Sequence, residues 1–179
     1  MFDRKRNIKL PILITGFATY RVARAILASF LIFNLSQANA DLGKETGLRV
    51  PRFVSLNSSK VNVRAGPGMR YPIKWVFQRQ SLPVQIIAES DTWRKIRDFE
   101  GVEGWAHQRM LSGRRRAIVI GDIRNLKKKP LSTSSTVALL EPRVILRLEL
   151  CRRQWCSVEV QSYSGWINRR YIWGIDEND

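Results

Sequence analysis

The same order of features occurs twice in this chain, and this repeat limits the fold more than any other property of the sequence. Each feature of the first copy returns 61 to 63 residues later. A repeat with so small a drift indicates two units of one architecture. Each unit would hold about 55 to 60 residues, a size at which a small domain can just fold alone. The matched pairs are Asn62-Val63-Arg64 and Asn125-Leu126-Lys127, Trp93 and Trp155, and Gly104-Trp105 and Gly165-Trp166.

Both copies are predicted to consist of β-strands. The runs LPVQIIA at 82–88 and VILRLEL at 144–150 alternate between two faces, as half-buried strands do. Other short runs, such as CSVEV and GWIN, are separated by turn-forming residues, and no helical period lies between them. Four or five short strands per copy favour a small β-barrel. The glycine before the second tryptophan of each copy predicts a tight strand entry, where a Cβ would collide with a crossing strand.

The predicted fold is therefore all-β, with two tandem small barrels after an N-terminal leader. The predicted segments are a signal peptide at 1–40, a lead-in at 41–57, a first domain at 58–113, a linker at 114–122 and a second, degenerate domain at 123–175. The linker, RRRAIVIGD, is expected to be short and partly strand-like.

The first 40 residues have the parts of a secretory signal peptide. They begin with basic residues, continue with the uncharged run AILASFLIFNLSQ and end in Ala-Asn-Ala. This order predicts cleavage between Ala40 and Asp41 and a periplasmic or secreted protein. An uncleaved membrane anchor and a buried helix are the alternatives. A start codon assigned too far upstream would explain the unusual length of the basic region. The uncharged run is shorter than the ~20 residues that span a membrane.

The chain is strongly basic, with a formal net charge of +16. Without residues 1–40 it keeps 25 basic and 14 acidic residues. Such a charge indicates an anionic partner, which could be nucleic acid, anionic lipid or an acidic wall polymer. Because an exported protein does not meet intracellular nucleic acid, we expect an envelope partner. Contact with the membrane is expected only through an uncleaved leader.

The stretch NVRAGPGMRYP at 62–72 could at first be taken for a phosphate-binding loop. A P-loop requires a lysine directly after its last glycine and then a helix, and neither pattern is present. As a turn the stretch is consistent, because Pro67 fixes its own φ while Gly66 and Gly68 can take positive φ values. We therefore predict a shaped loop without nucleotide chemistry.

The segment 61–111 resembles the bacterial SH3-like domain, often written SH3b. The resemblance rests on VNVRAGPGMRYP, the strand LPVQIIA, the run DTWRKI, then EGWAH and a closing Leu111. In that family the fold is a five-stranded small barrel, and the loop after NVR lies beside a ligand groove. Its members commonly bind peptidoglycan peptides, or serve as targeting modules attached to wall hydrolases. The second copy departs from the pattern, since KKPLSTSS replaces the glycine-proline-tyrosine run, although both of its matched tryptophans keep their places.

The resemblance implies an aromatic ligand groove in the first copy. Aromatic rings would stack on a peptide, and arginines would meet its carboxylates. The predicted ligand-binding residues are Arg64, Arg70, Tyr71, Trp75 and Trp93.

The positions of the tryptophans along their strands give expectations about burial. Trp105 and Trp166 directly follow a glycine within a strand and are expected to fill the two cores. Trp93 and Trp155 have the opposite parity to apolar residues such as Ile96, so they are expected to be exposed. Both ligand contact and plain surface packing remain open for the exposed pair.

The two cysteines, Cys151 and Cys156, lie in the run CRRQWC. Zinc binding would need at least two further ligands, and the single histidine lies in the other copy, while a redox pair would have C-x-x-C spacing. In an oxidising compartment we therefore predict a disulfide. Cys151 has the parity of Glu149 and Cys156 has that of Val158, so this bond requires a bulge or an irregular loop in the hairpin.

Catalysis has little support in the sequence. His107 has no predicted nucleophile or acid beside it, and we expect no metal site, no cofactor and no enzyme activity. We expect an exported, non-catalytic module that binds peptidoglycan peptides or other envelope material. The alternatives are a periplasmic protein-protein adaptor and a regulatory subunit of a cell-wall hydrolase. The sequence gives no oligomeric state.

Overall fold

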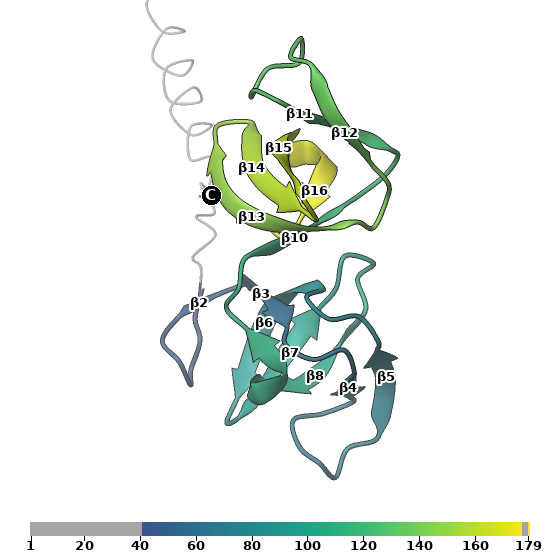
Figure 1. Cartoon of the computed structure of the whole chain (residues 1–179). Coiled ribbons are helices and arrows are strands. Elements are labelled where there is room, and N and C mark those ends of the chain that lie inside the picture. The colour runs from purple at the N-terminus through teal and green to yellow at the C-terminus, as the bar shows by residue number, and fades with distance from the viewer. Residues whose placement is uncertain (1–40, 177–178) are drawn as a thin grey trace, which may run out of the picture. The chain divides into compact units, whose positions relative to one another are not determined.

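The computed structural model describes residues 41–176 and 179 (Figure 1). The predicted signal peptide, with Ala40 of its cleavage site, lies outside the described residues. Asp41 begins strand β1 (Asp41–Leu42), which pairs with β2 (Arg49–Val50) in a short hairpin. Across the described part of the chain, no helix has the length and apolar character needed to cross a membrane.

The first large sheet has seven antiparallel strands in the order β5-β4-β8-β7-β6-β3-β9. A short 3₁₀ helix, η1 (Gln108–Met110), lies between its last two strands in the sequence. The strands are β3 (Arg52–Leu56), β4 (Val61–Arg64), β5 (Ile73–Phe77), β6 (Pro83–Ser90), β7 (Trp93–Arg97), β8 (Glu103–His107) and β9 (Leu111–Ser112).

The second large sheet has the order β12-β11-β15-β14-β13-β10-β16, which is the first order repeated element by element. Its 3₁₀ helix, η2 (Arg169–Tyr171), occupies the place of η1. The predicted all-β fold with two tandem domains of one architecture is thus confirmed. The strands are β10 (Arg116–Val119), β11 (Arg124–Lys127), β12 (Thr136–Leu140), β13 (Ile145–Arg152), β14 (Trp155–Val160), β15 (Tyr163–Asn168) and β16 (Ile172–Trp173).

Each domain begins with a strand that lies before its predicted start. Strand β3 falls in the predicted lead-in, yet it pairs with β6 and β9 of the first sheet. Strand β10 falls in the predicted linker, yet it pairs with β13 and β16 of the second. Strand β3 lies between β6 and β9, and β10 lies between β13 and β16. Both strands therefore belong to the sheets of their domains.

Strand β10 serves the cores of both domains. Ala117 and Val119 are fully buried in the core of the second domain. Ile118, which points to the opposite face, is fully buried in the core of the first domain. Trp173 of β16 also packs against the first core, where its ring meets Phe53 edge-on with centroids 4.8 Å apart. The apolar run AIVI is therefore a strand buried on both faces, which explains why it lacks polar residues.

The glycines before the second tryptophans face inward, as predicted from a collision with a crossing strand. A Cβ on Gly104 would lie 2.4 Å from Val63 Cγ1, and one on Gly165 would lie 2.7 Å from the carbonyl oxygen of Lys127. Because side chains alternate along a strand, the next residue must point outward. Trp105 and Trp166 are accordingly half-buried on the outer face. The expectation that they fill the cores was wrong.

The hairpin of β13 and β14 contains the predicted disulfide between Cys151 and Cys156. The two residues are directly opposite, with Cα atoms 4.0 Å apart. The pairing register shifts between Leu148 and Leu150, which supplies the bulge that the parity of the cysteines requires. The sequence prediction of a disulfide with a bulge is confirmed.

The same ladder position in the first domain is occupied by Glu89 opposite Arg94. This pair also follows a register shift, between Ile86 and Ala88. Arg94 Nε lies 3.4 Å from Glu89 Oε1, and both side chains are almost fully buried. One position of the repeated hairpin is thus closed by a covalent bond in the second domain and by an ion pair in the first.

Reducing the disulfide is expected to destabilise the second domain by about 2 kcal/mol, as loop-closure entropy gives for so short a ring. Urea unfolding followed by two-dimensional NMR, with and without reductant, reads the two domains separately. The first domain, which has no cysteine in its sequence, is the internal control. An unchanged midpoint for the second domain, or free thiols in the untreated protein, would contradict this expectation.

Candidate functional site

The loop between β4 and β5 is held in shape by Arg64. Its Nη1 donates hydrogen bonds to the carbonyl oxygens of Met69 at 3.1 Å and Tyr71 at 2.7 Å. The backbone N–H of Ala65 donates to the carbonyl of Pro72 at 3.0 Å and closes the base of the loop. The stretch at 62–72 therefore contains a loop with a defined shape. Arg64, which was predicted to bind a ligand, also stabilises that shape.

The glycines of this loop serve close packing against Tyr71. A Cβ on Gly66 would lie 2.5 Å from Tyr71 Cδ1, so only glycine lets the ring approach the backbone here. Neither Gly66 nor Gly68 has a positive φ. The expectation of left-handed glycines was therefore wrong, because the loop turns through the Tyr71 N–H to Gly68 carbonyl bond at 3.2 Å without them.

Arg70 and Tyr71 form a charged and aromatic pair on this loop. Arg70 Nη2 donates to the Tyr71 hydroxyl at 3.3 Å, and its guanidinium lies 5.1 Å from the ring centroid. The hydrogen bond to Tyr71 raises the pKa of Arg70, so the guanidinium stays charged. Arg70 is exposed and Tyr71 is half-buried. The pair can therefore offer a cation and an aromatic edge to an anionic partner.

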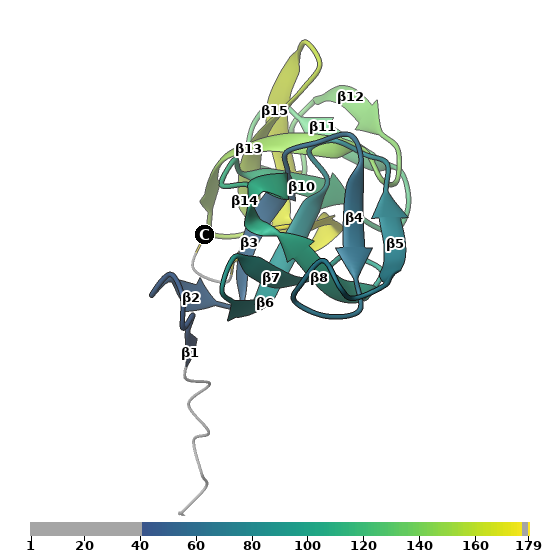
Figure 2. The same ribbon diagram turned by 90° about the horizontal axis from the view of Figure 1, so that it is seen from below.

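Trp75 belongs to β5, the strand that follows this loop. Strand β5 lies at one edge of the first sheet (Figures 1 and 2). The partner of Trp75 across the ladder is Val63, and 53% of the tryptophan surface is exposed. Among the described strands, β5 pairs with β4 alone. Met69 and Ile73 are exposed nearby in the sequence, at 74% and 46%. The edge of the first domain thus carries an apolar surface next to a basic loop.

Trp93 does not belong to that surface. Only 8% of it is exposed, and its ring packs edge-on against His107 with centroids 5.4 Å apart. The strand parity places it on the outer face as expected, but η1 folds back across this face. The N–H of Gln108 donates to the carbonyl of Thr92 at 2.8 Å. The prediction that Trp93 is exposed was therefore wrong. Trp155 of the second domain is half-buried, so it is not fully exposed either.

Trp105 is the outward-facing tryptophan that sequence reasoning assigned to the core. It pairs with Arg64 on one side and Lys95 on the other, so it stands in a row of outward residues across three strands. The inward glycine before it carried the signal, since the neighbour of an inward residue must point out. Glu103, on the same strand, accepts from Lys95 at 2.8 Å and Arg97 at 2.6 Å.

His107 caps the 3₁₀ helix η1. Its Nδ1 accepts a hydrogen bond from the N–H of Arg109 at 3.2 Å. In the second domain Asn168 makes the equivalent bond to Arg170, also at 3.2 Å. His107 therefore has a structural role. Its Nδ1 caps η1, and its ring packs against Trp93.

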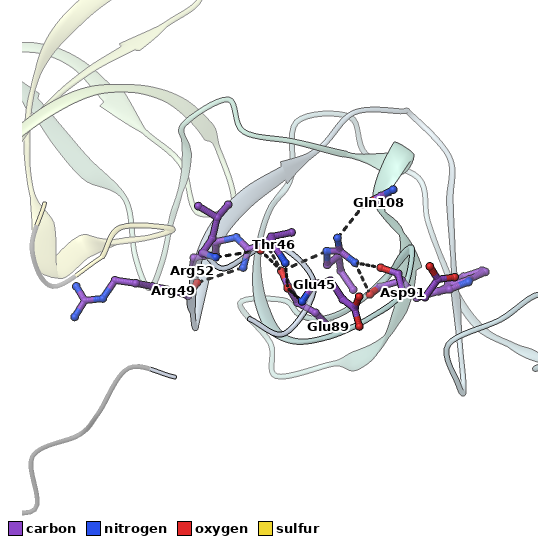
Figure 3. Close-up of polar contacts among 10 residues, drawn as sticks. Glu45, Thr46, Arg49, Arg52, Glu89, Asp91 and Gln108 are labelled. Atoms are coloured by element: carbon purple, nitrogen blue, oxygen red, sulfur yellow. Dashed lines mark hydrogen bonds and ion pairs between the residues drawn. The ribbon is translucent and has the colours of Figure 1, made fainter. Parts of the chain in front are cut away.

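The lead-in hairpin docks on a buried carboxylate, which the sequence gave no reason to expect (Figure 3). The side chain of Glu89 has no exposed surface. It accepts hydrogen bonds from the N–H of Glu45 at 3.1 Å, the N–H of Thr46 at 3.0 Å and the hydroxyl of Thr46 at 2.8 Å. Arg52 Nη2 lies 2.6 Å from the same carboxylate. Figure 3 shows these groups converging on Glu89.

The pKa of Glu89 reflects these contacts. Burial alone would raise it, but the hydrogen bonds from Arg52, Thr46 and Glu45 outweigh burial and lower the pKa from 4.5 to about 2. The carboxylate is therefore charged at neutral pH. It fastens the lead-in segment to the first domain.

The structure brings together three of the five predicted ligand residues. Arg64 ends β4 and donates to the loop that carries Arg70 and Tyr71, and Trp75 lies on β5, which follows that loop. Trp93 lies apart, at the start of β7, where its ring packs against His107 of β8.

A match to a protein family agrees with the two tandem domains. A family model described as Bacterial SH3 domain matches residues 57–113 and 121–174. Among solved structures, the chain is similar to NlpC2 from Trichomonas vaginalis, at 10% identity over 69% of this chain and 48% of that chain, with a TM-score of 0.32. It is also similar to NlpC1 from Trichomonas vaginalis, at 12% identity over 73% of this chain and 48% of that chain, with a TM-score of 0.32. The match thus spans less than half of each of those structures. No curated protein matches the chain.

Proposed function

Because the chain belongs to the bacterial SH3 domain family, with both of its domains matched by the family model, we propose that it is an exported, non-catalytic protein that binds the cell envelope. Its ligand is a peptidoglycan peptide or other envelope material. The binding face is the edge of the first domain formed by β5 and the loop before it.

The observation that carries this proposal is the exposed ring of Trp75 beside the basic loop. Trp75 leaves 53% of its surface exposed, and Met69 and Ile73, which are close to it in the sequence, are exposed as well. Apolar side chains gathered at one exposed edge are typical of interaction surfaces. Flat aromatic rings bind peptides with little loss of side-chain entropy. Arg70, whose charge is accompanied only by the Tyr71 ring and hydroxyl in the described contacts, can meet a carboxylate of that peptide.

In this proposal Trp105, and not Trp93, is a ligand-binding aromatic residue. It faces outward in the same row as Arg64, whereas Trp93 is buried under η1. A ligand that lies across β4 and β8 would meet Trp105, and one that lies along β5 would meet Trp75. Both rings border the loop that Arg64 holds.

Export and lack of catalysis are supported by two further features. The disulfide between Cys151 and Cys156 is typical of proteins outside the reducing cytosol. His107 is committed to a helix cap and to packing against Trp93. These features favour a binding protein outside the cytoplasm.

Retention of the purified protein on protein-free peptidoglycan sacculi tests the proposal. Trp75→Ala and Arg70→Gln are each expected to weaken retention about tenfold or more, since truncating an aromatic or arginine anchor commonly costs that much. Added salt should weaken retention further, because part of the attraction is between exposed charges.

Two matched variants serve as controls. Tyr163→Ala removes an aromatic ring that is 48% exposed in the second domain, and Arg79→Gln removes an exposed cation of the first domain outside the loop. Both should retain wild-type binding. Equal losses for the controls and the test variants, or no retention of the wild type at low salt, would overturn the proposal.

The edge position of β5 supports a second candidate, a protein-protein adaptor in the periplasm. An outermost strand with free backbone groups can add an extended peptide as a further strand. Failure on sacculi together with Trp75-dependent capture of a defined envelope protein would favour this function.

A further inference from the structure

A hollow lies in the second domain, where β11 and η2 meet the start of β14. Its volume is about 250 Å³. Arg124 and Lys127 of β11, Arg170 and Tyr171 of η2, and Trp155 of β14 all line it. Of the described residues that form its wall, none is acidic.

Two of its arginines are fixed against one tyrosine. The guanidinium of Arg124 lies 4.1 Å from the centroid of the Tyr171 ring, and that of Arg170 lies 4.6 Å from it. Arg170 also donates to the Tyr171 hydroxyl. Gly121 allows Arg124 to fold in, because a Cβ there would lie 2.9 Å from Arg124 Nη2. Both cations are thus positioned before any ligand arrives.

These cations have little compensating negative charge. Arg124 meets Asp122 at 3.4 Å, but that carboxylate is 92% exposed, so water screens the pair. Within the described residues, Arg124 Nε is the one buried side-chain nitrogen or oxygen with no hydrogen-bond partner. Lys127 adds a third positive charge, and its Nζ donates only to a neutral hydroxyl, that of Thr136, in the described contacts. Three cations around one hollow favour an anion inside it.

The rest of the lining suits a peptide better than a bare anion. Trp155 offers a half-buried ring, and Asn125 and Asn168 offer side-chain amides. The Oδ1 atom of Asn168 accepts the N–H of Arg170, which leaves its NH₂ group to donate to a peptide carbonyl. The hollow is slightly smaller than those that enclose whole small-molecule ligands, so it fits the end of a chain.

The cationic character belongs to the second copy and does not come with the repeated fold. In the first domain the residue at the place of Arg124 is Val61, which is fully buried in the core, and the residue at the place of Tyr171 is Met110. The second copy thus has the stacked arginine and tyrosine at positions where the first copy has two apolar residues. The first copy forms the same fold without these two residues, so their charge and aromatic ring are not required for folding.

We propose that this hollow is a second binding site, which takes the C-terminal carboxylate of a short peptide. Arg124 and Arg170 hold the carboxylate, and Trp155 packs on the side chain before it. The site does not depend on the face of the first domain, and the two can be tested apart.

Titration of the full chain with trialanine, followed by two-dimensional NMR, tests this proposal. Trialanine with a free carboxylate should shift the indole N–H of Trp155 and the side-chain amides of Asn125 and Asn168. Trialanine amide should bind at least about tenfold more weakly, since the arginines lose their charged partner. Arg124→Val, which copies the first domain, should remove the shifts, and Lys127→Gln should weaken them.

Lys129→Gln is the matched control, because it removes an exposed cation of the loop between β11 and β12 that does not line the hollow. It should leave the titration unchanged. Equal binding of trialanine and its amide would overturn the carboxylate assignment, and tighter binding of inorganic phosphate than of trialanine would overturn the peptide assignment. Absence of any shift at Trp155 would overturn the site itself, whatever the result on sacculi.

Discussion

Replacing Glu89 with glutamine is expected to lower the free energy of unfolding of the first domain by about 3 kcal/mol at pH 7. Glutamine keeps the shape of the side chain but leaves Arg52 and the buried Arg94 without a countercharge. Losing one partner of a buried ion pair typically costs about 3 to 5 kcal/mol. The lowering of the pKa from 4.5 to about 2 corresponds to a similar free energy, about 3 kcal/mol. Urea unfolding of wild type and variant measures the difference.

The difference should depend on pH in a defined direction. A carboxylate whose pKa is lower in the folded state contributes stability that is fully present above its unfolded pKa, here 4.5. This contribution is lost as the pH falls from 4.5 toward about 2. Wild type should therefore approach the stability of Glu89→Gln at low pH, where Glu89 also becomes neutral.

Glu103→Gln is the matched control for this test. Glu103 also accepts from two cations, Lys95 and Arg97, but its side chain is 31% exposed and those cations are exposed too. Exposed pairs are screened by water and contribute little. An effect of Glu103→Gln as large as that of Glu89→Gln, or no pH dependence for Glu89, would contradict the role given to burial.

Much of the fold was predictable because it depends on local patterns. The alternating runs predicted the central strands, and the offset of the repeat placed Gly104 and Gly165 at equivalent inward positions. The disulfide followed from the spacing of Cys151 and Cys156 and from the predicted oxidising compartment, and its bulge followed from their parity. The outward direction of Trp105 was also contained in the sequence, since an inward glycine fixes the direction of its neighbour.

The contacts that the sequence did not predict join residues that no period connects. Glu89 receives the lead-in hairpin from residues 43 and 44 positions earlier, and neither partner belongs to a motif. Trp93 has the outward parity that was expected, but η1 covers it. At the candidate site, the loop motif identified Arg64, Arg70 and Tyr71 as neighbours, whereas the bond from Arg64 to the Tyr71 carbonyl depends on the final turn of the loop.

Replacing Gly165 with alanine is expected to destabilise the second domain by about 3 kcal/mol. The new Cβ would lie 2.7 Å from the carbonyl oxygen of Lys127 and 2.8 Å from Leu126 Cγ. Overpacking a core costs about 1 to 3 kcal/mol, and the upper end applies here because a backbone atom of β11 cannot move without shifting its strand. Urea unfolding followed by two-dimensional NMR gives the midpoint of each domain.

Gly113→Ala is the control, because no atom of the described residues lies within 4 Å of a Cβ at that position. It should cost nothing and could add about 0.5 kcal/mol by restricting the unfolded chain. An unchanged midpoint for the second domain of Gly165→Ala would contradict the close approach of β15 to β11. If Gly165→Ala also lowered the stability of the first domain, strand β10 would be the cause. Ile118 of this strand belongs to the first core, while its neighbours Ala117 and Val119 belong to the second. The shared strand would then transmit the loss of stability from one domain to the other.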